Sequence, residues 1–81
     1  MEKKQILNKI AEQEYNWLKS LTISQFVAEY NQWFNLDEQN ALTEDDDTLE
    51  ESLPELRQDY VEDFMRYRED ESEEELIKLI N

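Results

Sequence analysis

The sequence predicts an all-α fold, a small helical bundle of three main helices plus one or two short helices. Apolar residues recur at intervals of three and four along most of the chain, which is the helical period. Ser or Thr stands three positions before Glu or Gln at three expected helix starts, as in helix capping boxes. No segment shows a convincing period of two, so we predict no strands.

The central element is a predicted helix over residues 53–69. One side carries a stripe of apolar residues, Leu53, Leu56, Tyr60, Phe64 and Tyr67. The opposite side carries carboxylates, Glu55, Asp59, Glu62, Asp63 and Glu69. We expect this helix to begin after Ser52, because Ser52 and Glu55 form a capping box and Pro54 fits the first turn.

The first half of the chain predicts two more helices. A helix over 2–19 places most of its apolar residues on one half of its circumference: Ile6, Leu7, Ile10, Ala11, Tyr15, Trp17 and Leu18. Glu14 lies in the middle of that half. A helix over 23–34 follows the capping box of Thr22 and Gln25. Its expected outer face carries one charge only: Gln25, Ala28, Glu29 and Gln32.

The second half of the chain holds most of the acid. The connector over 35–52 contains eight acidic residues and no basic one: Asp37, Glu38, Glu44, Asp45, Asp46, Asp47, Glu50 and Glu51. Thr43 with Asp46 three positions later favours a short helix over 44–51, and a long ordered loop is the alternative. A last short helix over 73–80 should begin after Ser72 and dock its apolar residues on the body.

The composition removes the usual catalytic and cofactor-binding residues. Without cysteine there is no thiolate chemistry, and without histidine the common general base and metal ligand are missing. Without glycine the chain has no phosphate-binding loop, no dinucleotide-binding turn and no EF-hand. We therefore expect a single acidic helical domain over 1–81 that is not an enzyme, with no catalytic residues, no cofactor and no metal site.

The net charge of −14 on 81 residues is larger than the magnitude of about 2–8 that keeps a small domain soluble. Such a chain is repelled by nucleic acids and anionic membranes, so we expect its partner to be a basic protein surface. No apolar run fits a membrane span or a signal peptide, and we expect a cytoplasmic protein.

Three interpretations of the acidic half remain. The carboxylates could be a solvated face, or a loose cation site around Asp45, Asp46 and Asp47, or a mimic of nucleic-acid phosphates. Carboxylates four residues apart on a helix lie about 5–6 Å apart at their Cβ atoms. Successive phosphates of one DNA strand rise by about 3.4 Å along the axis, which is the same order. We therefore favour phosphate mimicry.

Two resemblances bear on this interpretation. The tripeptide Glu51-Ser52-Leu53 is similar to the Asp-Ser-Leu motif of acyl carrier proteins, but Pro54 follows at once and only 29 residues remain. We therefore interpret Ser52 as an N-cap. In size, charge and lack of catalytic residues, the chain resembles the small acidic proteins with which phages and mobile elements block restriction or CRISPR nucleases. That analogy implies an inhibitor.

We predict a protein that occupies the basic nucleic-acid-binding cleft of another protein and does not itself bind nucleic acid. The predicted partner-binding residues are Asp45, Asp46, Asp47, Glu50, Glu51, Glu55, Asp59, Glu62, Asp63, Glu69, Asp70, Glu71, Glu73 and Glu74. The alternative is a protein-interaction or adaptor module that self-associates as a homodimer through the helix over 23–34.

Overall fold

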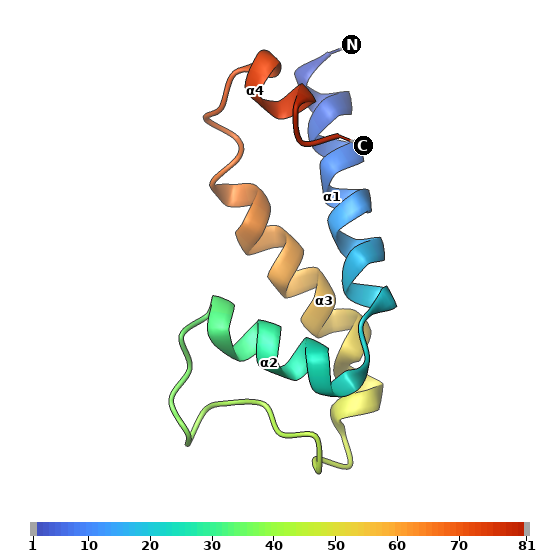
Figure 1. Cartoon of the computed structure of the whole chain (residues 1–81), viewed down its shortest axis with the longest axis vertical. Coiled ribbons are helices and arrows are strands. Elements are labelled where there is room, and N and C mark those ends of the chain that lie inside the picture. Colours follow the sequence, from blue (N-terminus) through green and yellow to red (C-terminus); the bar gives the residue numbers. More distant parts are fainter. Residues whose placement is uncertain (1, 81) are drawn as a thin grey trace.

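The computed structural model describes residues 2–80; residues 1 and 81 of the predicted domain lie outside the described residues. Within this range the chain forms four helices and no strand (Figure 1), so the predicted all-α class is confirmed. The helices are α1 (Lys3–Ser20), α2 (Ile23–Trp33), α3 (Leu49–Arg66) and α4 (Glu73–Ile77). Helices α1 and α3 run antiparallel, α2 crosses one end of this pair, and α4 lies at the other end beside the start of α1.

Helices α1 and α2 lie where the sequence predicts them, within one residue at each end. The capping box of α2 is confirmed: Thr22 Oγ1 accepts from the Gln25 N–H at 3.1 Å, and Gln25 Oε1 accepts from the Thr22 N–H at 3.0 Å. The prediction that Trp17 belongs to the buried apolar half of α1 is wrong, because its side chain is 42% exposed. Trp17 shares a side of α1 with Ile6 and Ile10, but α4 covers only those two.

Helix α3 begins four residues earlier than the sequence predicts, at Leu49. Leu49 is 3% exposed and packs in the main core, so the burial of its side chain stabilises the additional turn. Ser52 therefore lies inside the helix, and Thr48 is the N-cap residue. Pro54 falls in the second turn instead of the first. The predicted short helix over 44–51 is wrong. Residues 44–48 form two turns, and residues 49–51 are the first turn of α3.

The apolar residues form two clusters. The main one joins α1, α2 and α3 through Leu18, Phe26, Val27, Leu49, Leu53, Tyr60 and Val61. The smaller one joins α1 and α4 through Ile6, Ile10 and Leu76. Leu76 is fully buried, which confirms that the last helix docks on the body. This helix ends at Ile77 instead of residue 80, and Ile77 itself is 52% exposed. The Gln13 side-chain amide adds a hydrogen bond to the Leu79 carbonyl at 2.9 Å.

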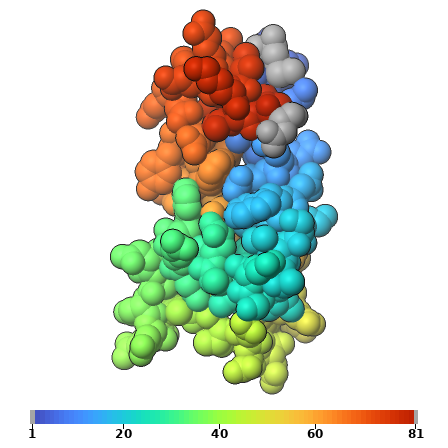
Figure 2. All heavy atoms as spheres, viewed as in Figure 1, coloured from blue at the N-terminus to red at the C-terminus, as the bar shows by residue number. Residues whose placement is uncertain are grey.

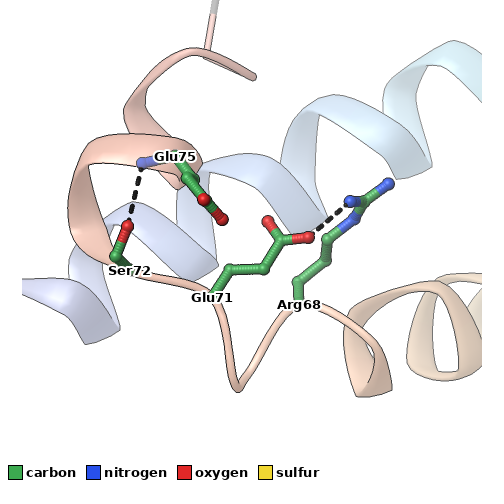
Figure 3. Close-up of polar contacts among 4 residues, drawn as sticks. All are labelled: Arg68, Glu71, Ser72 and Glu75. Carbon is green, nitrogen blue, oxygen red and sulfur yellow. Dashed lines mark hydrogen bonds and ion pairs between the residues drawn. The ribbon is translucent and has the colours of Figure 1, made fainter.

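The predicted helix over 53–69 ends early, at Arg66, and this moves Tyr67 out of the apolar stripe. Tyr67 is 67% exposed. The chain then turns toward α4, and an ion pair between Arg68 and Glu71 at 2.8 Å spans this turn (Figure 3). Ser72 caps α4 as predicted, accepting from the Glu75 N–H at 3.4 Å.

The chain leaves α2 without a glycine. Asn35 takes the left-handed conformation at φ 51°, a role that Asn fills next best after Gly. The Leu36 N–H bonds to the Asn31 carbonyl at 3.0 Å, which closes a Schellman-type end. The Asn31 side-chain amide then pairs in both directions with the backbone of Leu42, at 2.8 and 3.0 Å. These bonds fasten residues 34–48, here called the acidic segment, to α2.

Candidate interaction surface

Four carboxylates follow one another along the exposed side of α3, at spacings of 4, 4 and 3. We call this row the acid face: Glu51, Glu55, Asp59 and Glu62. All four residues are exposed, whereas Leu53 and Tyr60 on the other side of the helix are buried. Eleven residues of α-helix span about 16 Å, so the row forms a nearly straight line of charge on a rigid element.

No basic side chain neutralises the acid face among residues 2–80. The two ion pairs in this range join Arg66 to Asp63 at 3.5 Å and Arg68 to Glu71 at 2.8 Å. Arg57, the remaining arginine of α3, lies over the Phe26 ring at 6.0 Å from the centroid. The acid face therefore presents uncompensated negative charge.

Asp63 does not belong to the exposed row where the sequence analysis placed it. Its carboxylate accepts a hydrogen bond from the indole N–H of Trp33 at 2.9 Å, and its side chain is 23% exposed. Helix α2 crosses α3 at this level and brings Trp33 over Tyr60, with ring centroids 5.1 Å apart. Periodicity places Asp63 at the border of the polar side, and only the crossing of α2 decides which way it faces.

The prediction that Glu29 lies on the outer face of α2 is also wrong, because Glu29 lies at the α2–α3 interface. The Tyr60 hydroxyl donates to its carboxylate at 2.9 Å. The exposed side of α2 therefore carries no formal charge. We call it the amide face: Ser24, Gln25, Ala28 and Gln32. Figure 2 shows the side of the molecule on which α2 lies in front of α3.

The inward position of Glu29 has an electrostatic consequence for Glu14 of α1. Burial raises the pKa of the Glu14 carboxyl, the negative charge of Glu29 raises it further, and Arg68 opposes the shift. Burial and the hydrogen bond to Glu29 likewise raise the pKa of the Tyr60 hydroxyl. Glu14 is thus a partly buried carboxyl in the apolar half of α1, as its sequence position indicates.

The consecutive aspartates of the acidic segment, Asp45, Asp46 and Asp47, are all exposed. Asp46 accepts hydrogen bonds from the Thr48 N–H at 2.9 Å and hydroxyl at 2.7 Å, and these bonds lower the pKa of its carboxyl. A hollow of about 290 Å³ lies between these aspartates and α2. It is lined by Ile23, Glu44, Asp45, Asp46, Asp47, Leu49 and Glu50. Among residues 2–80 no three acidic side chains are arranged to hold a metal ion.

The remaining predicted residues lie at helix ends. Glu50 is exposed in the first turn of α3, and Glu73 and Glu74 are exposed in the first turn of α4. Carboxylates at these positions stabilise a helix through its dipole. Glu69 and Asp70 are exposed in the turn after α3, whereas Glu71 is engaged by Arg68. The structure thus distributes the predicted set over three areas, and only the acid face forms a row.

Sequence reasoning missed a hollow of about 270 Å³ between α1 and α3, here called the α1–α3 hollow. It is lined by Ala11, Glu12, Tyr15, Asn16, Gln58 and Val61. The pairs Ala11–Tyr15 and Glu12–Asn16 have helical spacing, and this was the available signal. Recognising the hollow also required the knowledge that α1 and α3 pack side by side.

No protein-family model matches the sequence, and neither a curated protein nor a solved structure matches the chain. In the described part of the chain, no helix combines the length and the apolar character that crossing a bilayer requires.

Proposed function

We propose that this protein is a non-enzymatic cytoplasmic inhibitor that binds the basic nucleic-acid-binding cleft of another protein. The acid face of α3 takes the place of nucleic-acid phosphates in that cleft. The observation that supports this most directly is the row of four exposed carboxylates on one rigid helix, none of which forms an ion pair among residues 2–80.

The spacing of the row suits this role. Successive carboxylates of the acid face lie three or four residues apart, so their Cβ atoms are about 5–6 Å from each other. That is the same order as the 3.4 Å axial rise of phosphates along one strand. A cleft that binds phosphates with Lys and Arg side chains can therefore engage several of these carboxylates at once.

The distribution of charge also supports the proposal. A solubility function requires only a modest net charge and no particular arrangement. Here the exposed side of α2 is uncharged, while every charged residue on the exposed side of α3 before Arg66 is acidic. Segregated charge of one sign steers association with a surface of the opposite sign and speeds the encounter.

The test begins with the immobilised protein in a lysate of its source cell at moderate salt, followed by elution with duplex DNA. A target that is held through its nucleic-acid-binding cleft should elute with DNA and bind more weakly as salt rises. A stable ternary complex of this protein, the purified target and DNA would exclude occlusion of the cleft.

A variant that reverses the acid face to lysine at all four positions should lose the target and keep its helical fold, because none of these side chains contributes to the core. The matched control reverses four other exposed carboxylates: Glu69, Asp70, Glu73 and Glu74. Both variants change the net charge by the same amount. If they weaken binding equally, net charge and not the acid face is responsible.

One observation favours the alternative of self-association through α2. Because Glu29 lies at the α2–α3 interface, two copies could approach through their amide faces without opposing carboxylates. Sedimentation of the protein between micromolar and millimolar concentration tests this directly. A dimer that is disrupted by Ala28→Arg and unaffected by reversal of the acid face would establish the adaptor.

A further inference from the structure

We propose that the α1–α3 hollow binds an arginine side chain of the protein partner. This inference rests on the proposed function in one respect, because the basic cleft is what would supply the arginine. The binding of an arginine side chain can nevertheless be measured on this chain alone.

The walls of the hollow match the parts of an arginine side chain. Val61, 3% exposed, and Ala11 form an apolar floor against which the aliphatic stem of arginine can pack. The Tyr15 ring offers a π surface on which a guanidinium can stack. At about 270 Å³ the hollow is smaller than the roughly 300–1,000 Å³ of typical small-molecule sites, so a single side chain is a suitable occupant.

The polar lining of the hollow accepts hydrogen bonds and attracts positive charge. Glu12 has no ion-pair partner among residues 2–80. Asn16 and Gln58 add amide groups on either side. The Gln58 amide nitrogen donates to Glu62 at 3.4 Å, so its carbonyl oxygen is the atom available to a ligand. A guanidinium, with five donors in a plane, can use several of these acceptors together.

A cation already lies near the aromatic wall. The Lys19 ammonium is 6.0 Å from the centroid of the Tyr15 ring. Lys19 is exposed, so a cation from a partner can displace it without breaking a buried contact. Arginine fits better than lysine, because its planar group stacks on a ring and is less strongly hydrated than an ammonium.

The location of the hollow links it to the acid face. Gln58 lies between Glu55 and Asp59 along α3 and lines the hollow, which therefore opens at the edge of the row. Carboxylates of the row would attract a basic surface from a distance, and the hollow would then select one arginine from it. Charge alone cannot distinguish one basic cleft from another, whereas a shaped pocket can.

The experiment is a nuclear magnetic resonance titration of the ¹⁵N-labelled protein with Nα-acetyl-arginine amide. The same amides of lysine and of citrulline, which has the shape of arginine without its charge, serve as control probes. We expect shifts concentrated at the residues that line the hollow, and weaker binding of both control probes. Shifts spread evenly along α3, or equal binding of the lysine probe, would overturn the proposal.

Variants make the test specific. Glu12→Gln and Asn16→Ala change exposed residues and should each weaken the arginine probe about two- to fivefold, as should Tyr15→Leu. Glu74→Gln on α4 removes the same charge as Glu12→Gln and should leave binding unchanged. If Glu74→Gln has the same effect as Glu12→Gln, the hollow is not the site.

Lys19 provides the opposite test. Lys19→Ala should strengthen binding of the arginine probe, because it removes the cation that competes for the Tyr15 ring. Lys9→Ala removes an equal charge elsewhere on α1 and should strengthen binding less. An equal gain in both variants would contradict competition at the ring. The failure of DNA to displace the target would overturn the proposed function and leave these titration results standing, so the two can fail separately.

Discussion

Helices α2 and α3 share one aromatic interface and present opposite surfaces to the solvent. On α2 the exposed residues form the uncharged amide face, and on α3 the exposed residues include the four carboxylates of the acid face. Glu29, the one carboxylate of α2, is hydrogen-bonded to Tyr60 at the interface and so does not charge the amide face, and Asp63 of α3 is hydrogen-bonded to Trp33. The negative charge of this molecule is therefore arranged by the packing of its helices and is not a uniform coating.

The difference shows what each helix can contribute to function. A uniformly acidic surface would repel any second copy and attract any basic surface. Here only one side of the α2–α3 pair is acidic, so an approach by a basic partner is oriented from the start. The following predictions test the shared interface first, then the two carboxylates removed from the surface, then the surfaces themselves.

The largest effect should come from the shared interface. Phe26→Ala removes a side chain that is 1% exposed and should lower the free energy of unfolding by about 3–5 kcal/mol. A domain of this size has a total stability of only about 4–12 kcal/mol, so both exposed faces should be lost together. Urea unfolding followed by circular dichroism measures this. Gln32→Ala on the amide face is the control, and its effect should stay within about 0.5 kcal/mol.

A smaller loss of stability should distinguish substitution of Asp63 from substitution of Asp59 on the acid face. Asp63→Lys leaves the Trp33 indole N–H without its acceptor and should cost about 1–3 kcal/mol. Asp59→Lys makes the same change of charge on an exposed residue and should be neutral or slightly stabilising. Asp63→Asn retains an acceptor oxygen and should fall between them. Equal urea midpoints for the two lysine variants would show that the Trp33–Asp63 hydrogen bond does not contribute to stability.

The position of Glu29 predicts a pH dependence at Glu14. Because the pKa of the Glu14 carboxyl is raised above its ordinary value of 4.5, the folded state binds this proton more tightly than the unfolded chain does. Its stabilising contribution is complete below pH 4.5 and is lost as the pH rises through the raised pKa. Glu14→Gln should therefore match the wild type in melting temperature at pH 4 and exceed it at pH 7.

The control for this prediction is Glu12→Gln on the exposed side of the same helix. It should not change the difference in melting temperature between pH 4 and pH 7. If Glu14→Gln is less stable than the wild type at pH 7, then the attraction between Glu14 and Arg68 outweighs the burial of the carboxyl and its repulsion by Glu29.

Local sequence signals predicted what depends on local contacts. The capping box of Thr22 and Gln25 is present with both of its hydrogen bonds, and Ser72 caps α4. The same pattern at Ser52 and Glu55 misled, because the buried side chain of Leu49 extends α3 by one turn before it. The capping pattern at Ser52 therefore did not decide the start of α3, because the buried side chain of Leu49 made the longer helix favourable.

The surfaces required information that one helix cannot carry. Periodicity correctly placed Glu55, Asp59 and Glu62 on the exposed side of α3, because they lie opposite the buried stripe. It could not place Glu29 or Asp63, which lie at the borders of their polar sides and whose direction depends on how α2 crosses α3. The α1–α3 hollow was missed for the same reason, since each helix contributes only part of its lining.

The smallest effect, and the one most specific to the contrast between the two faces, concerns salt. Neighbouring carboxylates on α3 lie about 5–6 Å apart, within the Debye length of about 10 Å at 0.1 M salt, so they repel one another in dilute buffer. The two ion pairs in residues 2–80, which salt would weaken, both join residues only three apart in the sequence. The melting temperature of the wild type should therefore rise as salt increases.

Two variants test this prediction. The triple variant Glu55→Gln, Asp59→Asn, Glu62→Gln removes charge from the acid face and should show a smaller rise. The double variant Gln25→Glu, Gln32→Glu charges the amide face and should show a larger one. Calorimetric scans between about 20 mM and about 500 mM NaCl, a range from weak to strong screening, measure the three slopes. A wild type that melts at a lower temperature in high salt would show that attraction outweighs repulsion on this surface, and the acid face could then no longer be regarded as uncompensated charge available to a basic partner.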